Sequence, residues 1–536
     1  MIPVHVHTNH SLLQSAVKID ELIERCKAEN IPAVAVTDTN SMAGLIQFIK
    51  KANEEKIKPL LGAYIDDPVK YEQYILLIAK NNQGYSDLCK IITQRKLNDD
   101  FELSSIIRKH WKNLIIITPS IELLKISDKK NQIYAEIIVT KKSKKNSRAL
   151  FTFASENKIP LVASNPVYFL NKGDFEIHKL VSSIRENKTL DSISEDDLVD
   201  EEFYFKDKKK IEKIFQKIPE AIENTYKIAS DCNVDLDIGK YKFPVYTNDI
   251  KTDSVGLLKE IALEGFKKKY SLENSVAYKR LEYELSVISE LNFSDYFLIV
   301  WDVVKEAKRR GMMLIGRGSA ANSIVSYCLD FTQIDPVKYN LYFERFLNKA
   351  RSNPPDIDLD FSWKERDEII IYIFEKYGYE RVAMISTIVT FKARSAFRET
   401  AKAFGISERE ISGYSKKIPW TSAVNLDQVS QKFPESKHLG FDKEPWKSIV
   451  RLASRLADFP RHLSIHPSGL VITPGKITEY CALEYAKNKG LGLIITQPDM
   501  YSIEDLGLIK IDLLSQRSLG VLRDTMNVLE NRGKEN

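Results

Sequence analysis

Residues 355–361 read PDIDLDF, a stretch in which three aspartates alternate with apolar residues. In an extended strand, residues two apart point to the same side, so Asp356, Asp358 and Asp360 line one face. Three like charges held together are costly unless cations neutralise them. Hard oxygen ligands at this spacing suit Mg²⁺, which shares its remaining coordination positions with waters and substrate phosphates. The stretch predicts a strand that binds magnesium, and a solvated strand edge and a calcium-like loop are the alternatives.

Two flanking segments supply chemistry that complements the aspartates. Upstream, GRGSAANS (316–323) places glycines before an apolar run that begins like a helix, so the backbone can approach an anion there. Arg317 and Ser319 add donors directed at phosphate. Downstream, the strand-like KID segment places Lys510 and Asp512 on one face. Each segment alone also occurs as an ordinary loop or surface pair, but together they suggest in-line nucleotidyl transfer on two metal ions.

The N-terminal part of the chain alternates short β-rich runs with helical ones. VAVTD (34–38) and YILLIAK (74–80) are typical of buried strands, and IDELIERCKAEN (19–30) of a helix between strands. This alternation predicts an α/β layered or barrel-like domain over residues 1 to about 170. The lysine-rich segment 141–147 is predicted to be an exposed loop.

The remaining chain is predominantly helical at first and then mixed. LKEIALEGFKKKY and LEYELSVISELNFSDYFLIVWDVVKEAKRRG show apolar residues at helical spacing, and Gly311 supplies a stop signal. Amphipathic stretches run from 363 to 405. GLVIT (469–473) and LGLIKIDLL (506–514) are predicted strands. The whole chain is predicted to be an α/β multidomain protein.

The bulk composition limits the possible classes of protein. A chain of 536 residues exceeds one hydrophobic core and predicts three or four domains, and an apolar fraction of 43% excludes wholesale disorder. No apolar run approaches the roughly 20 residues that cross a bilayer, and the polar N-terminus lacks a secretion signal. The five cysteines show no CxxC spacing, which indicates reduced thiols. We therefore expect a cytoplasmic protein without a membrane partner.

The charge distribution leaves nucleic-acid binding open. The net charge of +5 neither demands nor forbids it. Lysine clusters at 141–145, 208–210 and 267–269 are of the kind that contacts phosphates, and solvated helix faces or loops are the simpler interpretation of each.

In combination, the motifs resemble those of bacterial DNA polymerase III alpha subunits, which are C-family DNA polymerases. The similarity extends along nearly the whole chain in the family's order. The matching segments are HVHTNHS (5–11), YFLIVWD (296–302), GRGSAANS (316–323), DP (335–336), FERFLN (343–348), PPDIDLDF (354–361), ARSAFRE (393–399), RHLSIHPSGLVI (461–472) and LGLIKIDLL (506–514).

The resemblance implies a role for each site residue. Asp356 and Asp358 resemble the family's first two metal-binding aspartates, Asp512 resembles the third, and two Mg²⁺ ions are the implied cofactor. Asp360 belongs to the motif as a structural residue. The residues implied to bind the nucleotide or primer are Arg317, Gly318, Ser319, Lys510, Lys392, Arg394 and Arg398. The implied reaction is attack of a primer 3′-hydroxyl on a deoxynucleoside triphosphate.

The resemblance also implies a domain order and partners. A barrel-like PHP domain would occupy residues 1–175, a partly helical connecting or thumb region 176–295, and a polymerase-β-like nucleotidyltransferase palm 296–536. Thumb helices would be inserted at about 400–460. Fingers, clamp-binding region and OB-fold of the full-length family members are not expected in this chain. The implied partners are primer–template DNA, a deoxynucleoside triphosphate and, through regions outside this chain, the sliding clamp and other polymerase III subunits.

The N-terminal domain resembles PHP domains whose metal ligands are partly replaced. His5, His7, Asp38 and Glu136 match the ligand pattern. Thr39 and Tyr64 stand where the pattern has a histidine and a glutamate, and Pro166 and Tyr168 replace an Asp-x-His pair. Because each lost ligand removes charge and coordination, the domain is predicted to be structural, with metal binding unlikely and no phosphoesterase or proofreading activity.

Three further interpretations stay open at this point. The residues of three motifs resemble the accessory, error-prone branch of the family more than the replicative branch; these motifs are RGSAANS, PPDIDLDF and PRHLSIH. A non-catalytic DNA-binding or scaffold remnant of such a polymerase is one alternative function. A PHP-type phosphoesterase of small phosphate esters is the other.

Overall fold

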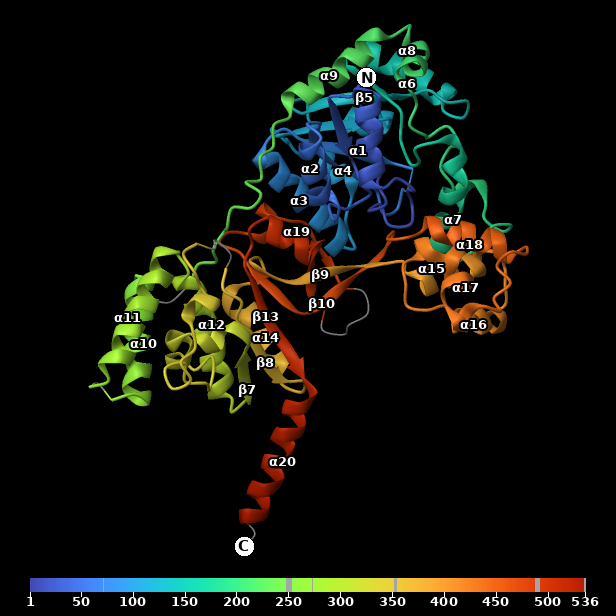
Figure 1. Cartoon of the computed structure of the whole chain (residues 1–536). Helices are drawn as coiled ribbons and strands as arrows, with labels where there is room; N and C mark the ends of the chain where they lie inside the picture. The colour runs from blue at the N-terminus through green and yellow to red at the C-terminus, as the bar shows by residue number, and fades with distance from the viewer. Residues whose placement is uncertain (71, 247–252, 272, 351–353, 487–491, 535–536) are drawn as a thin grey trace.

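Two β-sheets organise the chain, and helices cover them (Figure 1). The structure, a computed structural model, describes residues 1–70, 72–246, 253–271, 273–350, 354–486 and 492–534. The six-stranded sheet lies in the N-terminal part, and the seven-stranded sheet is built from the second half of the chain. The chain is thus a mixed α/β protein, as its sequence predicts.

The first sheet follows the chain order from its first strand to its sixth. Its strands are β1 (Ala33–Val36), β2 (Lys58–Asp66), β3 (Tyr74–Ala79), β4 (Leu114–Thr118), β5 (Gln132–Ile138) and β6 (Leu161–Ser164). The N-terminal segment hydrogen-bonds to β1 through the Pro3 and Val6 carbonyls, and it pairs with Val167 just after β6. Because one segment joins both edges, the sheet is curled.

Eight helices among the described residues lie around this sheet. They are α1 (Ile19–Ala28), α2 (Leu45–Glu54), α3 (Asn82–Leu97), α4 (Leu103–Ile107), α5 (Ile121–Ile126), α6 (Lys144–Glu156), α8 (Lys208–Phe215) and α9 (Pro219–Asp231). The inner apolar residues of the strands and helices form a core that continues into the second sheet, because Ile385 and Val471 belong to the same cluster. The first sheet therefore packs against the second.

The second sheet has the strand order β11-β12-β9-β10-β13-β8-β7. Its strands are β7 (Leu314–Arg317), β8 (Asp358–Ser362), β9 (Val382–Thr390), β10 (Pro460–Ile472), β11 (Leu483–Tyr485), β12 (Ile494–Asp499) and β13 (Lys510–Gln516). β13 lies between β10 and β8, antiparallel to the first and parallel to the second. The last strand of the chain thus occupies the middle of the sheet.

Helices α10 (Ser254–Lys269), α11 (Ser275–Glu290), α12 (Ser294–Arg309), α13 (Ile324–Cys328) and α14 (Arg366–Tyr377) share one apolar core with this sheet. α12 is apolar over most of its surface and buries ten of its residues, which makes it the central helix of this half. Leu359, Ile511 and Leu513 point from the strands into that core. The opposite face of β8 and β13 is therefore the one available to a site.

A separate helical lobe is inserted between β9 and β10 (Figure 1). Its helices are α15 (Ala393–Ala403), α16 (Glu408–Ser415), α17 (Val429–Lys432) and α18 (Trp446–Arg455). Helix α7 (Phe175–Glu186), from much earlier in the chain, belongs to the same apolar cluster. Two further helices complete the fold: α19 (Met500–Asp505) follows β12, and α20 (Arg517–Lys534) projects from the body at the lower end of Figure 1.

Most of the elements predicted from sequence are present, with two differences. The predicted helix 19–30 and strands 34–38 and 74–80 correspond to α1, β1 and β3. The prediction of a loop at 141–147 is wrong in part, since α6 begins at Lys144; its lysines still point outward, as expected for a solvated helical turn. The amphipathic stretch 363–405 contains strand β9 between two helices.

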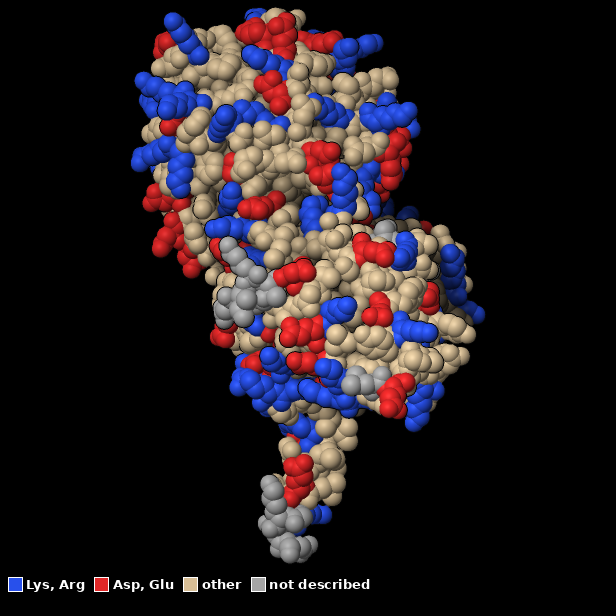
Figure 2. Space-filling view, turned by 90° about the vertical axis from the view of Figure 1, so that its left-hand side faces the viewer, with Lys and Arg blue, Asp and Glu red and all other residues tan. Residues whose placement is uncertain are grey.

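The distribution of charge and the absence of long apolar helices are also visible in the structure. Figure 2 shows basic and acidic side chains interspersed over one face of the molecule, with basic side chains gathered along the lower edge of the body. Among the described residues, no helix is long and apolar enough to cross a membrane.

Candidate active site

The three predicted metal-binding aspartates meet on the outer face of the second sheet. Asp358 on β8 is the register partner of Asp512 on β13, and on its other side it pairs with Arg317 on β7. Asp356 lies just before β8. Carboxylate oxygens of Asp356, Asp358 and Asp512 all lie within 4.8 Å of one another. It is the only such group of three or more potential ligands in the described part of the chain.

The carboxylates lack enough positive charge to neutralise them. Partial burial and the charge of Asp512 raise the pKa of Asp356, and burial followed by the charges of Asp356 and Asp512 raises that of Asp358. Lys510 Nζ lies 2.8 Å from Asp512 Oδ2, and Arg317 Nε lies 3.9 Å from Asp358 Oδ2. A divalent cation fits this donor set, because it would remove the remaining repulsion among three oxygen ligands.

The glycine-rich turn lies beside the same carboxylates. Gly318 has φ +74°, in the left-handed region that favours glycine, and a Cβ added to it would lie 3.8 Å from Asp358 Oδ2. A Cβ at Gly316 would lie 1.7 Å from the Phe331 carbonyl oxygen, so only glycine fits. The turn continues as the 3₁₀ helix η3 (Gly318–Asn322), with Gly318 exposed and Ser319 half-buried. The exposed Gly318 thus lies next to the Asp358 carboxylate.

Asp360, predicted to be structural, is buried and lies two residues after Asp358 on β8. Arg317 Nε is 3.3 Å from its Oδ1 atom, which makes no hydrogen bond within the protein. Arg317 thereby contacts both aspartates of β8 and remains nearly half exposed.

The predicted PHP ligands divide into two groups in the first sheet. His5 Nδ1 lies 2.7 Å from Glu136 Oε1, and His5 Nε2 lies 3.1 Å from His7 Nε2. Asp38 is held apart from them, accepting hydrogen bonds from the Thr8 backbone and from the hydroxyls of Thr8 and Ser11. Three of the four predicted ligands are thus in direct contact, and Asp38 reaches His7 only through Ser11.

Aromatic and hydroxyl side chains satisfy the histidines and Glu136. Glu136 accepts hydrogen bonds from Tyr74 at 2.7 Å and Ser164 at 2.6 Å. Burial raises the pKa of Glu136, but the charge and hydrogen bond of His5 outweigh burial and leave that pKa below its usual value. The Tyr168 ring, at a position where the family pattern has a ligand, stacks on His7 with centroids 4.1 Å apart.

Two family models match different parts of the chain. The model described as bacterial DNA polymerase III alpha NTPase domain matches residues 256–515, and the PHP domain model matches residues 3–149. The chain thus combines the NTPase domain of the bacterial DNA polymerase III alpha family with a PHP domain. All three aspartates and the glycine-rich turn lie inside the range of the NTPase domain model.

Curated relatives of this family align with almost the whole chain. The Bacillus subtilis protein named DNA polymerase III subunit alpha is 31% identical over 99% of this chain and 49% of its own length. The Symbiobacterium thermophilum protein named Error-prone DNA polymerase is 31% identical over 98% and 52%, respectively. The chain therefore spans about half the length of the curated relatives that it matches. Because both names occur at the same identity, the error-prone branch stays a prediction.

The family's arginine-bearing segment does not contact the aspartates. The lobe helix α15, which carries Arg394 and Arg398 and begins directly after Lys392, lies away from β8 and β13 in Figure 1. Lys392 Nζ donates to Asp458, Arg394 to the Ile418 carbonyl, and Arg398 to Ser415 and Glu408. Their predicted role in binding nucleotide or primer stays a prediction.

Sequence reasoning missed two residues that shape the site. Ser468 Oγ donates to Asp512 Oδ1 at 2.8 Å. His466 accepts the Gly469 N–H at its Nδ1 atom at 2.8 Å and so fixes the bend of the chain next to Asp512. The segment HPSG (466–469) lies in a motif identified from the sequence. Only the pairing of Gly469 with Asp512 shows that this segment lies beside β13.

Proposed function

We propose that this chain carries the nucleotidyl-transfer centre of a DNA-directed DNA polymerase, acting in replication or in error-prone repair synthesis. One observation carries the proposal: three carboxylates lie within 4.8 Å of one another, directly beside an exposed Gly-Ser turn. This arrangement combines a place for two divalent cations with a place for phosphates. Membership of the family and the names of the relatives support the same reaction.

The residues of the site have separate tasks in this reaction. Asp356, Asp358 and Asp512 supply the oxygen ligands for the cations. The Gly318–Ser319 turn offers backbone N–H groups and a hydroxyl to the triphosphate, and Lys510 offers a positive charge. Two Mg²⁺ ions, when bound, would favour the ionised primer 3′-hydroxyl and neutralise the phosphates. The bond formed joins that hydroxyl oxygen to the α-phosphorus, and the bond broken releases pyrophosphate.

The remaining domains and partners follow from the same proposal. The second sheet corresponds to a polymerase-β-like palm, the lobe of α15–α18 to thumb helices, and the first sheet to a PHP domain that serves as structure without metal chemistry. Primer–template DNA and deoxynucleoside triphosphates are the substrates, in the cytoplasm. The sliding clamp and other polymerase III subunits are the further partners of the proposed function.

Primer extension by the purified protein with Mg²⁺ tests the proposal. We expect extension by the wild type and none by Asp356→Ala. Glu368→Gln is the matched control, because it removes an exposed carboxylate from α14, which packs against the same sheet but not at the cluster. Extension that persists in Asp356→Ala would contradict the proposal. Primer–template binding without extension would instead indicate a non-catalytic DNA-binding protein or a requirement for the missing half of the relatives' length.

A further inference from the structure

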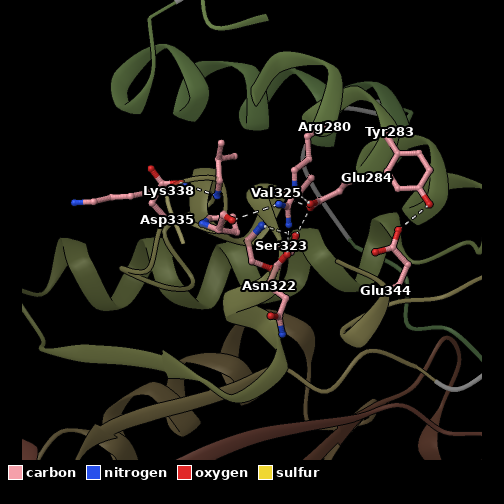
Figure 3. Close-up of polar contacts among 12 residues, drawn as sticks. Arg280, Tyr283, Glu284, Asn322, Ser323, Val325, Asp335, Lys338 and Glu344 are labelled. Atoms are coloured by element: carbon pink, nitrogen blue, oxygen red, sulfur yellow. Dashed lines mark hydrogen bonds and ion pairs between the residues drawn. The ribbon is translucent and has the colours of Figure 1, made fainter. Parts of the chain in front are cut away.

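A buried ion pair on α11 holds the glycine-rich turn from behind (Figure 3). The two partners are Arg280 and Glu284, one helical turn apart, with Arg280 Nε 2.9 Å from Glu284 Oε1. The Glu284 side chain is fully buried. Neither residue belongs to a motif from which the site was predicted, and neither contacts the aspartates.

Glu284 binds the first turn of α13, directly after the glycine-rich segment. Its Oε2 atom accepts the Ser323 hydroxyl at 2.7 Å and the Val325 backbone N–H at 3.2 Å. Ser323 also caps α13 by accepting the Ser326 N–H. The carboxylate therefore fixes the end of the segment whose beginning is Gly318.

Arg280 reaches the same segment through its guanidinium group. Its Nη2 atom donates to the Asn322 carbonyl at 2.7 Å, and its Nη1 atom to the Pro336 carbonyl at 3.3 Å. The Asn322 side chain in turn donates to the Ser319 carbonyl at 3.0 Å. A continuous chain of hydrogen bonds thus runs from α11 through Asn322 to Ser319, the neighbour of Gly318 in the turn.

Burial of this pair is hard to explain as stabilisation alone. Burial raises the pKa of Glu284 despite its hydrogen bonds, which shows that the ionised form is held at a cost. Apolar residues of similar volume commonly give equal or greater stability than a buried ion pair. The directional bonds to Ser323, Val325 and Asn322 instead fix the turn in one position.

We propose that Arg280 and Glu284 are positioning residues that set the Gly318–Ser319 turn at the distance from the aspartates that triphosphate binding requires. The inference rests on the proposed polymerase function, because it assigns the turn to the nucleotide. Positioning of this kind acts on nucleotide binding and not on primer–template binding, since the pair lies behind the turn and away from the open face of the sheet.

Steady-state primer extension with varied deoxynucleotide concentration tests the proposal with Glu284→Ala and Glu284→Gln. We expect KM for the nucleotide to rise at least tenfold in Glu284→Ala, with primer–template Kd within twofold of wild type. Glu284→Gln keeps an acceptor for Ser323 and should show a smaller rise. The control is Tyr283→Phe, which removes an exposed bond of the same helix to Glu344, drawn beside the pair in Figure 3, and should leave KM unchanged.

Hydrogen exchange of the amides of residues 319–325 provides a readout that does not depend on catalysis. Exchange in this segment should accelerate in Glu284→Ala and stay at the wild-type rate in Tyr283→Phe. Wild-type exchange together with an unchanged KM would overturn the proposal. If Glu284→Ala does not fold, the same two measurements on Glu284→Gln decide.

The outcomes separate failure of this inference from failure of the proposed function. If the wild-type protein does not extend primers, the proposed function of this chain is rejected. Loss of amide protection in Glu284→Ala would still support the restraint on the turn.

A double variant that combines Glu284→Ala with Ser323→Ala adds a second criterion. Its effect on KM should be clearly less than the product of the two single effects, because both residues act through one contact. Fully multiplicative effects would contradict a shared route.

Discussion

The aspartate cluster of the second sheet and the histidine cluster of the first sheet hold their ionisable groups in opposite ways. Asp356, Asp358 and Asp512 lie within 4.8 Å of one another with only Lys510 and Arg317 as close positive charges, and the pKa values of Asp356 and Asp358 are raised. His5 and Glu136 contact each other, and Glu136 also accepts hydrogen bonds from Tyr74 and Ser164. The first cluster keeps repulsion among its carboxylates, whereas the second is satisfied by hydrogen bonds within the protein.

The difference offers a criterion that residue type does not supply. Both clusters consist of residues that bind metals in other proteins, so residue type alone does not distinguish them. We propose that the remaining repulsion marks the aspartates as a cation site and that the internal hydrogen bonds mark the histidine cluster as structural. Four predictions, from the largest expected effect to the smallest, test this contrast.

Asp512→Asn should reduce primer extension by roughly 1,000-fold or more, because it removes one of three charges that hold the cations. The side chain keeps an oxygen that accepts the Ser468 hydroxyl, so the fold should persist. Single-turnover extension measures the effect, with circular dichroism as the check on folding. Extension within tenfold of wild type would show that Asp512 is not a ligand.

Glu136→Ala should destabilise the protein by about 3–5 kcal/mol, because it leaves the buried His5 without its partner. Urea unfolding measures the loss. Glu122→Ala is the matched control in the same domain, since its exposed pair with Lys70 is screened by solvent and should leave stability nearly unchanged. If the wild-type protein holds a stoichiometric metal ion that the folded Glu136→Ala variant has lost, the His5–Glu136 cluster is a metal site and the contrast between the two clusters does not hold.

Ser468→Ala should weaken Mn²⁺ binding at the aspartate cluster roughly tenfold, because it frees the Asp512 carboxylate to rotate. His7→Ala should leave this affinity unchanged. Titration with Mn²⁺ observed by electron paramagnetic resonance compares the two variants. Equal weakening by both substitutions would mean that the measured ion is not at the aspartates.

Asp358→Asn should raise the Tm of the metal-free protein by about 2 °C at pH 7. The pKa of Asp358 is raised in the folded state, so its contribution to stability falls as the pH rises above the usual aspartate pKa of about 3.9.

Glu136 should show the opposite dependence on pH. Its pKa is lowered in the folded state, so its contribution to stability is complete above about pH 4.3 and is lost as the pH falls through the folded value. Glu136→Gln should therefore lower the Tm at pH 7, and calorimetry with chelator at pH 7 and pH 5 checks both signs.

The aspartate cluster was predictable because its chemistry lies in short continuous motifs. PDIDLDF alternates with the period of a strand, and KID repeats that period near the end of the chain, so both strands were predicted. The structure adds that β13 is parallel to β8 and directly beside it. Strand adjacency depends on contacts between distant segments, which a period of two does not encode.

Residues that depend on contacts between distant segments were less predictable. Ser468 and His466 lie in a motif, but only the pairing of β10 with β13 brings them next to Asp512, and Glu284 reaches Ser323 and Val325 only because α11 packs against α13. The long strand β9 was missed inside an amphipathic stretch, where packing against β10 and β12 outweighs local pattern. Conversely, the motif residues Arg394 and Arg398 could be named from the sequence but not placed, because the lobe that carries them interrupts the sheet between β9 and β10.

The central position of β13 has a consequence for how the chain is made. During synthesis, β7 and β8 emerge long before β13, and β9 to β12 form a second group of strands on the other side of its place. Until β13 is inserted, β8 and β10 each expose an unpaired edge, a form prone to wrong pairing and aggregation. Insertion of β13 therefore brings Asp512 to the cluster and closes the second sheet in the same step. A chain that ended before β13 would lack the third aspartate and would be prone to aggregate through the unpaired edges of β8 and β10.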